Sequence, residues 1–225
     1  MKVDTPSTTV NKVCASGMKT VMLGATAIAA GDRNTIVAGG FESMSKAPHY
    51  IYLRKATGYG HAQVVDSIQF DGLTDVYNNI LMGSCTEKTC SEMGITREAQ
   101  DEYAIRSYNR ARKAQETGVF DWEIVDIVEQ DNKGKEKRIS KDEECQKFFP
   151  EKFPQLKPAF AKNGTITPAN SSKINDGACT IILMAEEVAK ERGLKPLARI
   201  IGYEDAEVAP IDFGVAPAKA VTRLL

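Results

Sequence analysis

The chain has 225 residues, and 42% of them are hydrophobic, which is enough apolar material for one large domain or two small ones. Lys and Arg number 29 against 30 Asp and Glu, a net charge of −1, so general electrostatic attraction to nucleic acid or an anionic membrane is excluded. No apolar run approaches the roughly 18 residues that cross a bilayer. We therefore expect neither a nucleic acid nor a membrane as a partner.

In the first part of the chain, a helix followed by a strand is predicted. Apolar residues over 14–30 recur at helical spacing, and Gly31 is placed to end the helix. The short apolar run at 35–40 is typical of a buried strand in a parallel sheet. Glycines then interrupt any periodicity between 43 and 95, where we expect mostly loop with short helices. A helix next to a buried strand indicates an α/β layer.

A long helix is predicted to follow Thr96, which is a suitable N-cap, and to end at Gly118. Its shared face is expected to hold Tyr103, Ser107, Tyr108, Ala111 and Ala114. Further along, strands are predicted at 123–129, 177–184 and 197–203, and helices at 186–192 and from about Pro217.

Cys14 is the candidate nucleophile. It falls where a helix is predicted to begin, so the free backbone N–H groups and the positive end of the helix dipole would favour its thiolate and could hold an oxyanion. The alternative is that Cys14 is a small buried hydrophobic residue, as most isolated intracellular cysteines are. His49 and His61 do not lie in a recognisable catalytic motif, and we expect them to be exposed loop residues.

A series of motifs resembles the thiolase family. The segments that carry the resemblance are Asn11-Lys12-Val13-Cys14-Ala15-Ser16-Gly17, Gly39-Gly40-Phe41-Glu42-Ser43-Met44, Met82-Gly83-Ser84-Cys85, Gln100-Asp101-Glu102-Tyr103-Ala104 and Asn170-Ser171-Ser172 with Asn175-Asp176-Gly177-Ala178. The form around Cys14 is similar to acetyl-CoA C-acetyltransferases, and the stretch 71–77 is similar to their mitochondrial animal form.

The resemblance implies an α/β fold of the thiolase-like layered βαβ type, with an incomplete first half and the start of a second half. Residues 1–190 would be a partial N-terminal domain, with its core at 1–43 and 173–190 and an inserted loop domain at 44–172. Residues 191–225 would begin the C-terminal domain. The Asn-Glu-Ala-Phe, Gly-His-Pro and Cys-x-Gly motifs of the family's second half do not occur in this sequence. We therefore expect a fragment that does not turn over alone.

The activity implied by the resemblance is the reversible Claisen condensation of two acetyl-CoA to acetoacetyl-CoA, through a thioester on Cys14. Coenzyme A would be a substrate, no resident cofactor would be required, and the protein would be a mitochondrial homotetramer, with the cytoplasm as the alternative location. Two other functions stay open. One is a non-catalytic CoA-binding or thiolase-associating fragment, and the other is a decarboxylating ketoacyl synthase, whose cysteine context is less similar.

The resemblance also assigns binding residues. Those implied to bind CoA are Tyr108, Lys147, Phe148, Phe149, Lys152, Ser172 and Met82. Those implied to hold a potassium ion are Tyr108, Pro168, Ala169 and Ser171. Lys147, Pro168 and Leu81 stand where the family has arginine, alanine and histidine. The simpler alternatives are that Tyr108 is a core residue of its helix and that the charged segment around Lys147 is only solvated.

Overall fold

The computed structural model describes residues 2–54 and 58–225, which form two compact units. The first unit comprises Met1–Met82 and Ile174–Leu225, and the second comprises Gly83–Lys173. Among the helices of the described residues, none is both long and apolar enough to cross a membrane. The predicted domain boundaries at 44–172 and 191–225 stay predictions.

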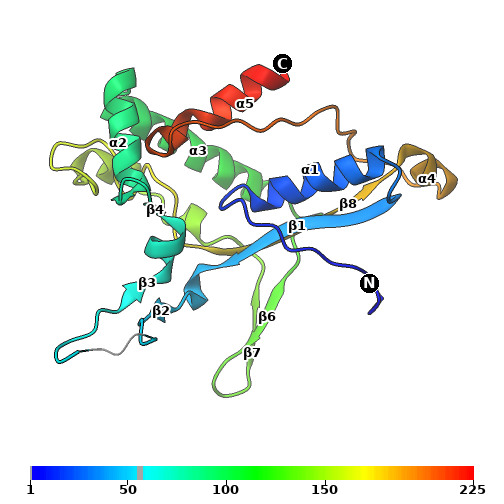
Figure 1. Cartoon of the computed structure of the whole chain (residues 1–225), viewed down its shortest axis with the longest axis horizontal. Coiled ribbons are helices and arrows are strands. Elements are labelled where there is room, and N and C mark those ends of the chain that lie inside the picture. Colours follow the sequence, from blue (N-terminus) through cyan, green and yellow to red (C-terminus); the bar gives the residue numbers. More distant parts are fainter. Residues whose placement is uncertain (1, 55–57) are drawn as a thin grey trace. The chain divides into compact units, whose positions relative to one another are not determined.

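The centre of the first unit is helix α1 (Ser16–Ala29) packed on a two-stranded ladder (Figure 1). Strands β1 (Thr35–Ser43) and β8 (Asp176–Met184) pair antiparallel along their whole length. The two strands were predicted at these places, but the expectation of a parallel sheet was wrong for this pair. Apolar runs indicate burial and extended structure, and they do not encode the direction of the partner. Residues 176–182 of β8 are exposed, so the prediction of a buried strand was wrong for most of its length.

Small residues allow α1 to lie close to the strands. A Cβ added at Gly24 would lie only 2.7 Å from Cδ1 of Leu183, and one added at Gly40 would lie 3.1 Å from Cα of Gly17. The helix ends as predicted at Gly31, whose φ of 74° is in the left-handed region. The Gly31 N–H donates to the Ile28 carbonyl at 3.0 Å, which closes the last turn.

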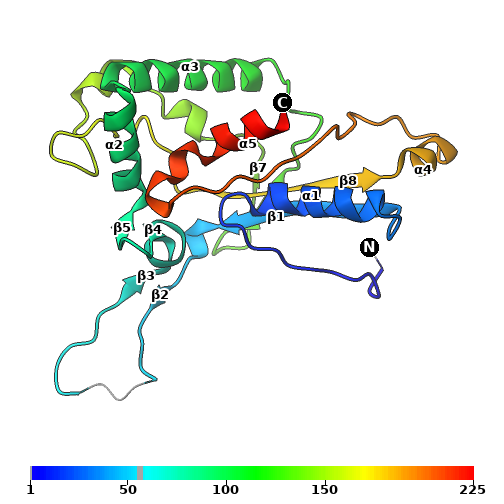
Figure 2. The same ribbon diagram turned by 45° about the horizontal axis from the view of Figure 1, so that its top comes forward.

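The rest of the first unit is mostly irregular. Its other strands form the short pairs β2 (His49–Tyr50) with β3 (Val65–Asp66) and β4 (Thr74–Asp75) with β5 (Ile80–Leu81), and its other α-helices are α4 (Glu186–Glu191) and α5 (Ala216–Leu224). The strand predicted at 197–203 is absent from the described structure. This segment runs beside α1 instead (Figure 2), where the hydroxyls of Tyr203 and Thr26 are 2.7 Å apart.

The second unit is built on helix α3 (Arg97–Glu116), which turns away from α2 (Met82–Met93) at Gly94 (Figure 2). The Thr96 hydroxyl accepts the Ala99 N–H at 3.2 Å, which confirms the predicted N-cap. Helix α2 was not expected at its full length, because its sequence is polar and contains Gly83. A hairpin of β6 (Ile127–Gln130) and β7 (Glu136–Ile139) follows α3.

The face that α3 packs inward differs from the predicted one. Asp101 is buried and Ala104, Ile105 and Tyr108 are half-buried, whereas Tyr103 is exposed. The prediction was therefore correct for Tyr108 and Ala114 and wrong for Tyr103, Ser107 and Ala111, which are exposed. The difference arises because the helix buries an ion pair as well as apolar side chains, and apolar spacing alone does not reveal that.

Candidate active site

Cys14 is exposed and lies directly before helix α1. This excludes the alternative of a buried hydrophobic residue. Three hydrogen bonds fix the loop that carries it: the Val13 N–H donates to Asn11 Oδ1 at 2.9 Å, the Lys12 N–H donates to Ser16 Oγ at 2.8 Å, and Ser16 Oγ donates to the Val13 carbonyl at 2.7 Å. Val13 has a φ of 49°, which is unfavourable for a β-branched residue. Such strain persists only where the surroundings fix it, and it occurs often at functional sites.

The first turn of α1 supplies backbone N–H groups near Cys14. The Ser16 N–H donates to the Val13 carbonyl at 3.1 Å, whereas Gly17 and Met18, the next two helical residues, have no carbonyl partner within their own helix. The turn is held against β1, because the Gly39 N–H donates to Thr20 Oγ1 at 3.0 Å. An exposed thiol beside a fixed helix N-terminus can accept an acyl group while the N–H groups face the developing oxyanion.

The lysines on either side of Cys14 share one carboxylate. Asp205 pairs with Lys12, at 3.2 Å between Nζ and Oδ1, and with Lys19 through Oδ2. The hydrogen bonds from Lys19 and then Lys12 lower the pKa of Asp205 below its usual value. Asp205 offsets one of the two ammonium charges, so Lys12, Lys19 and Asp205 together keep one positive charge. His49 and His61 are both exposed, as predicted, and His49 lies on β2.

The second unit contains an aromatic cluster of Tyr108, Phe148 and Phe153. The rings of Tyr108 and Phe148 stack with centroids 5.0 Å apart, and Phe153 meets each of the other two edge-on. Phe148 is 9% exposed, whereas its neighbour Phe149 is 50% exposed and lies 4.4 Å from the Lys152 ammonium. Of the two phenylalanines predicted to contact CoA, Phe149 offers the more accessible ring.

Glu144 connects this cluster to two lysines. Its Oε1 accepts the Tyr108 hydroxyl at 3.0 Å, and its Oε2 lies 3.2 Å from the Lys147 ammonium. Burial and the hydrogen bond to Glu144 raise the pKa of Tyr108 to about 12. Burial alone would raise the pKa of Glu144, but the hydrogen bonds from Tyr108 and Lys147 outweigh it and lower that pKa.

The raised pKa of Tyr108 predicts a loss of stability in alkali. The unfolded chain releases this proton near pH 10, and the folded chain keeps it until about pH 12, so the stabilisation is complete below pH 10 and is lost as the pH rises towards 12. Urea unfolding between pH 8 and 12 checks this. Tyr108→Phe should show a smaller alkaline decrease, and an identical decrease in both proteins would contradict the prediction.

The loop over 165–173 holds the residues predicted to bind potassium. It is organised by Thr167, which is fully buried. The Thr167 N–H donates to Asn170 Oδ1 at 2.8 Å, and the Thr167 carbonyl accepts Ser171 Oγ at 2.6 Å. Glu87 on α2 accepts the N–H groups of Thr165 and Ile166, both at 2.9 Å. The turn that carries Pro168, Ala169, Ser171 and Ser172 is therefore fixed by partly buried hydrogen bonds.

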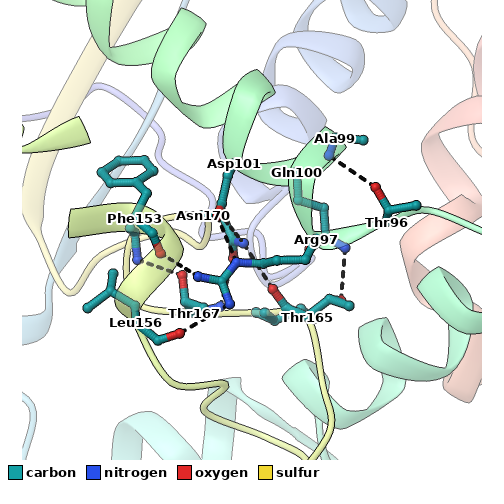
Figure 3. A network of polar contacts seen from close by, with 12 residues as sticks. Thr96, Arg97, Ala99, Gln100, Asp101, Phe153, Leu156, Thr165, Thr167 and Asn170 are labelled. Atoms are coloured by element: carbon teal, nitrogen blue, oxygen red, sulfur yellow. Dashed lines mark hydrogen bonds and ion pairs between the residues drawn. The ribbon is translucent and has the colours of Figure 1, made fainter. Parts of the chain in front are cut away.

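Arg97 joins this loop to the segment near Phe153 (Figure 3). Its Nε donates to Asp101 Oδ2 at 2.8 Å, and its Nη1 and Nη2 donate to the carbonyls of Leu156 and Phe153. The other oxygen of Asp101 accepts Asn170 Nδ2 at 2.9 Å. The mostly buried pair of Arg97 and Asp101 on α3 therefore positions two separate segments. Arg97 holds the segment at Phe153 and Leu156, and Asp101 holds the loop at Asn170.

The predicted site residues divide between the two units. Cys14 and Met82 belong to the first, where the Met82 N–H donates to the Leu73 carbonyl at 2.9 Å. The second contains Tyr108, Lys147, Phe148, Phe149, Lys152, Pro168, Ala169, Ser171 and Ser172. Sequence reasoning missed Arg97, Glu144 and Lys173. Glu144 and Lys173 lie in charged or polar stretches that are usually solvated, and only the i, i+4 spacing of Arg97 and Asp101 was visible in the sequence.

The sequence matches the family model for the thiolase N-terminal domain over residues 1–187. It is 52% identical to a probable acetyl-CoA acetyltransferase of Dictyostelium discoideum, over 98% of this chain and 54% of that protein. It is 48% identical to the mitochondrial acetyl-CoA acetyltransferase A of Xenopus laevis, over the whole of this chain and 54% of that protein. The chain therefore spans about half the length of these curated relatives.

Solved structures give the same result. A thiolase from Ascaris suum in complex with coenzyme A matches with a TM-score of 0.87 and 46% identity, over 95% of this chain and 55% of that one. An acetyl-CoA acetyltransferase from Bacillus anthracis matches with a TM-score of 0.89 and 41% identity, over 94% of this chain and 54% of that one. These matches confirm the predicted α/β thiolase-like fold. The extent of the family match and these identities show that the chain belongs to the thiolase family.

Proposed function

We propose that the protein is an acetyl-CoA C-acetyltransferase in which Cys14 accepts the acetyl group. The observation that carries the proposal is the exposed thiol at the N-terminus of α1, in a chain about half identical to proteins named for this activity. The Cys14 sulfur attacks the thioester carbonyl of acetyl-CoA, and the carbon–sulfur bond to CoA breaks. The CoA thiolate leaves and takes up a proton, and the acetyl group stays on Cys14.

The second half of the reaction is the attack of an acetyl-CoA carbanion on the acetylated Cys14, which yields acetoacetyl-CoA. Free CoA attacking the same thioester reverses the first step. The carbanion forms when the acetyl methyl group of acetyl-CoA loses a proton, and we assign this proton transfer to no residue of this chain. The Gly17 and Met18 N–H groups of the first turn of α1 would hold the oxyanion of both tetrahedral intermediates, because the first N–H groups of a helix have no carbonyl partner within it.

Apart from Met82, which belongs to the first unit, the residues proposed to bind CoA belong to the second unit. Phe149 would stack on the adenine, and Lys147 and Lys152 would pair with phosphates. Ser172 would lie beside the pantetheine, and Tyr108 and Phe148 would support the site from the aromatic cluster. The relative from Ascaris suum was solved with coenzyme A bound, which supports CoA as the ligand of this chain. We also propose a mitochondrial location, shared with the Xenopus laevis relative, and a homotetramer.

The release of CoA tests the proposed acyl transfer. The chain is mixed with excess acetyl-CoA, and free CoA is quantified by chromatography at short times. We expect a burst of CoA equal in amount to the chain, because each Cys14 releases one CoA when it is acetylated. Binding of acetyl-CoA by calorimetry without any release would favour the non-catalytic CoA-binding alternative. If the chain neither releases CoA nor binds acetyl-CoA, both functions are contradicted for this chain.

Replacing Phe149 with alanine should weaken CoA binding about tenfold, because the loss of one stacking contact with a base costs on the order of 1–3 kcal/mol. Phe149 is half exposed, so the stability of the fold should hardly change. The matched control is Phe120→Ala, which removes a similarly exposed ring in the same unit and should leave CoA affinity unchanged. Calorimetric titration with CoA measures both, and equal affinities for the two variants would contradict the stacking role.

A further inference from the structure

The ammonium group of Lys173 lies at the loop for which the resemblance implied a potassium ion. Its Nζ donates to the Pro168 carbonyl and lies 3.8 Å from Glu144 Oε1. The side chain is 30% exposed, so it is partly withdrawn from water. The hydrogen bond to Pro168 brings the charge of Lys173 to a backbone carbonyl five residues earlier in the same loop.

The Tyr108 hydroxyl and the Lys173 ammonium group contact the same oxygen, Glu144 Oε1. Glu144 Oε1 accepts that hydroxyl at 3.0 Å and also faces Lys173, while Glu144 Oε2 faces Lys147. Glu144 is mostly buried, and a buried carboxylate needs charged and hydrogen-bonding partners to stay ionised. The Lys173 ammonium group therefore contacts both the Pro168 carbonyl of the loop and the Glu144 carboxylate.

These contacts do not fit an additional monovalent metal ion. The implied potassium set is Tyr108, Pro168, Ala169 and Ser171. Within it, the Pro168 carbonyl already accepts the Lys173 ammonium, and the Tyr108 hydroxyl donates to Glu144. An ammonium group and a potassium ion carry the same charge and are similar in size, so the two would repel each other in one cluster of oxygens.

We propose that Lys173 is a built-in cation that takes the place of a monovalent metal ion and fixes the 168–172 loop for CoA binding. This rests on the proposed function, in which Ser172 contacts the pantetheine. CoA binding by the unaltered chain is then independent of potassium. In a variant without the Lys173 ammonium group, the Pro168 carbonyl oxygen and Glu144 Oε1 lose their shared positive charge. These two oxygens then become a site for an added monovalent cation.

The test compares CoA affinity in potassium, sodium and N-methylglucamine chloride at one ionic strength. For the unaltered chain and for Lys162→Met, which removes an exposed lysine of the same unit, the affinity is expected to be equal in all three salts. Lys173→Met is expected to bind CoA about tenfold more weakly in N-methylglucamine chloride and to recover in potassium chloride. Lys173→Arg, which keeps the charge, is expected to stay independent of the salt.

The midpoint of thermal unfolding in the same salts gives a readout that does not need CoA. Potassium is expected to raise the midpoint of Lys173→Met and not that of the unaltered chain. If the unaltered chain binds CoA more tightly in potassium, or if Lys173→Met shows no effect of the cation in either assay, the proposal is overturned. If no protein binds CoA but potassium stabilises only Lys173→Met, the proposed CoA site fails while the role of Lys173 stands.

Discussion

Cys14→Ser is expected to release CoA from acetyl-CoA at least about a thousandfold more slowly than the unaltered chain, because loss of a nucleophile removes the covalent route altogether. A serine hydroxyl stays protonated at neutral pH and has no adjacent base in the loop formed by Asn11 to Ser16 to take its proton. The other hydrogen bonds of the loop involve backbone groups and the Asn11 and Ser16 side chains, so the fold should be unaffected.

The matched control is Cys179→Ser. Cys179 is the other exposed cysteine and lies on β8 in the same unit, away from any helix N-terminus in sequence. Its replacement should leave the burst of CoA unchanged. Circular dichroism shows whether both variants keep their secondary structure. A folded Cys14→Ser chain that still gives the full burst would show that another group accepts the acetyl.

Arg97→Ala is expected to lower the free energy of unfolding of the second unit by about 3 kcal/mol, because it leaves the Asp101 carboxylate buried without its ion-pair partner. The side chains of Arg97 and Asp101 are only 18% and 11% exposed. The carbonyls of Phe153 and Leu156 would lose their hydrogen bonds from Arg97 at the same time, and the Phe153 carbonyl would keep the one from the Leu156 N–H. Urea denaturation measures the change. Arg97→Lys should be intermediate, since an ammonium group cannot reach three acceptors as the planar guanidinium does.

Arg112→Ala provides the comparison on the same helix. Arg112 also faces a carboxylate four residues later, Glu116, but the atoms are 3.9 Å apart and both side chains are about half exposed or more. Its loss, including its contact with the Phe148 ring, should cost about 1 kcal/mol or less. Equal destabilisation by the two alanine variants would show that the network around Arg97 does not hold the loops together.

The sequence predicted the helices of this fold better than its sheet. Helical periodicity with Thr96 at one end and Gly31 or Gly118 at the other located α1 and α3 to within two residues. Both signals are local, because caps and left-handed glycines act within one turn. The antiparallel pairing of β1 with β8 joins residues about 140 positions apart, and nothing in either strand alone specifies its partner or direction.

The candidate site was predictable to the extent that it is local or is carried by family motifs. The place of Cys14 before a helix made it a candidate, and the family motif around it favoured it as the nucleophile; the thiol is exposed. The contacts of Glu144 with Tyr108 and Lys173 join segments about 30 residues apart, so no local pattern indicates them. Arg97 was equally hidden, because two of its acceptors are backbone carbonyls, which every residue has.

The most direct test of Cys14 as the acyl acceptor is to find which cysteine carries the acetyl group. The chain is exposed briefly to labelled acetyl-CoA and digested under acidic conditions, and the acetylated peptides are identified by mass spectrometry. Cys14 and Cys179 are both exposed, so accessibility alone would label them at similar rates. Label on the Cys14 peptide well before the Cys179 peptide is the predicted result. Label on both at the same rate, or on Cys179 first, would contradict the role of Cys14.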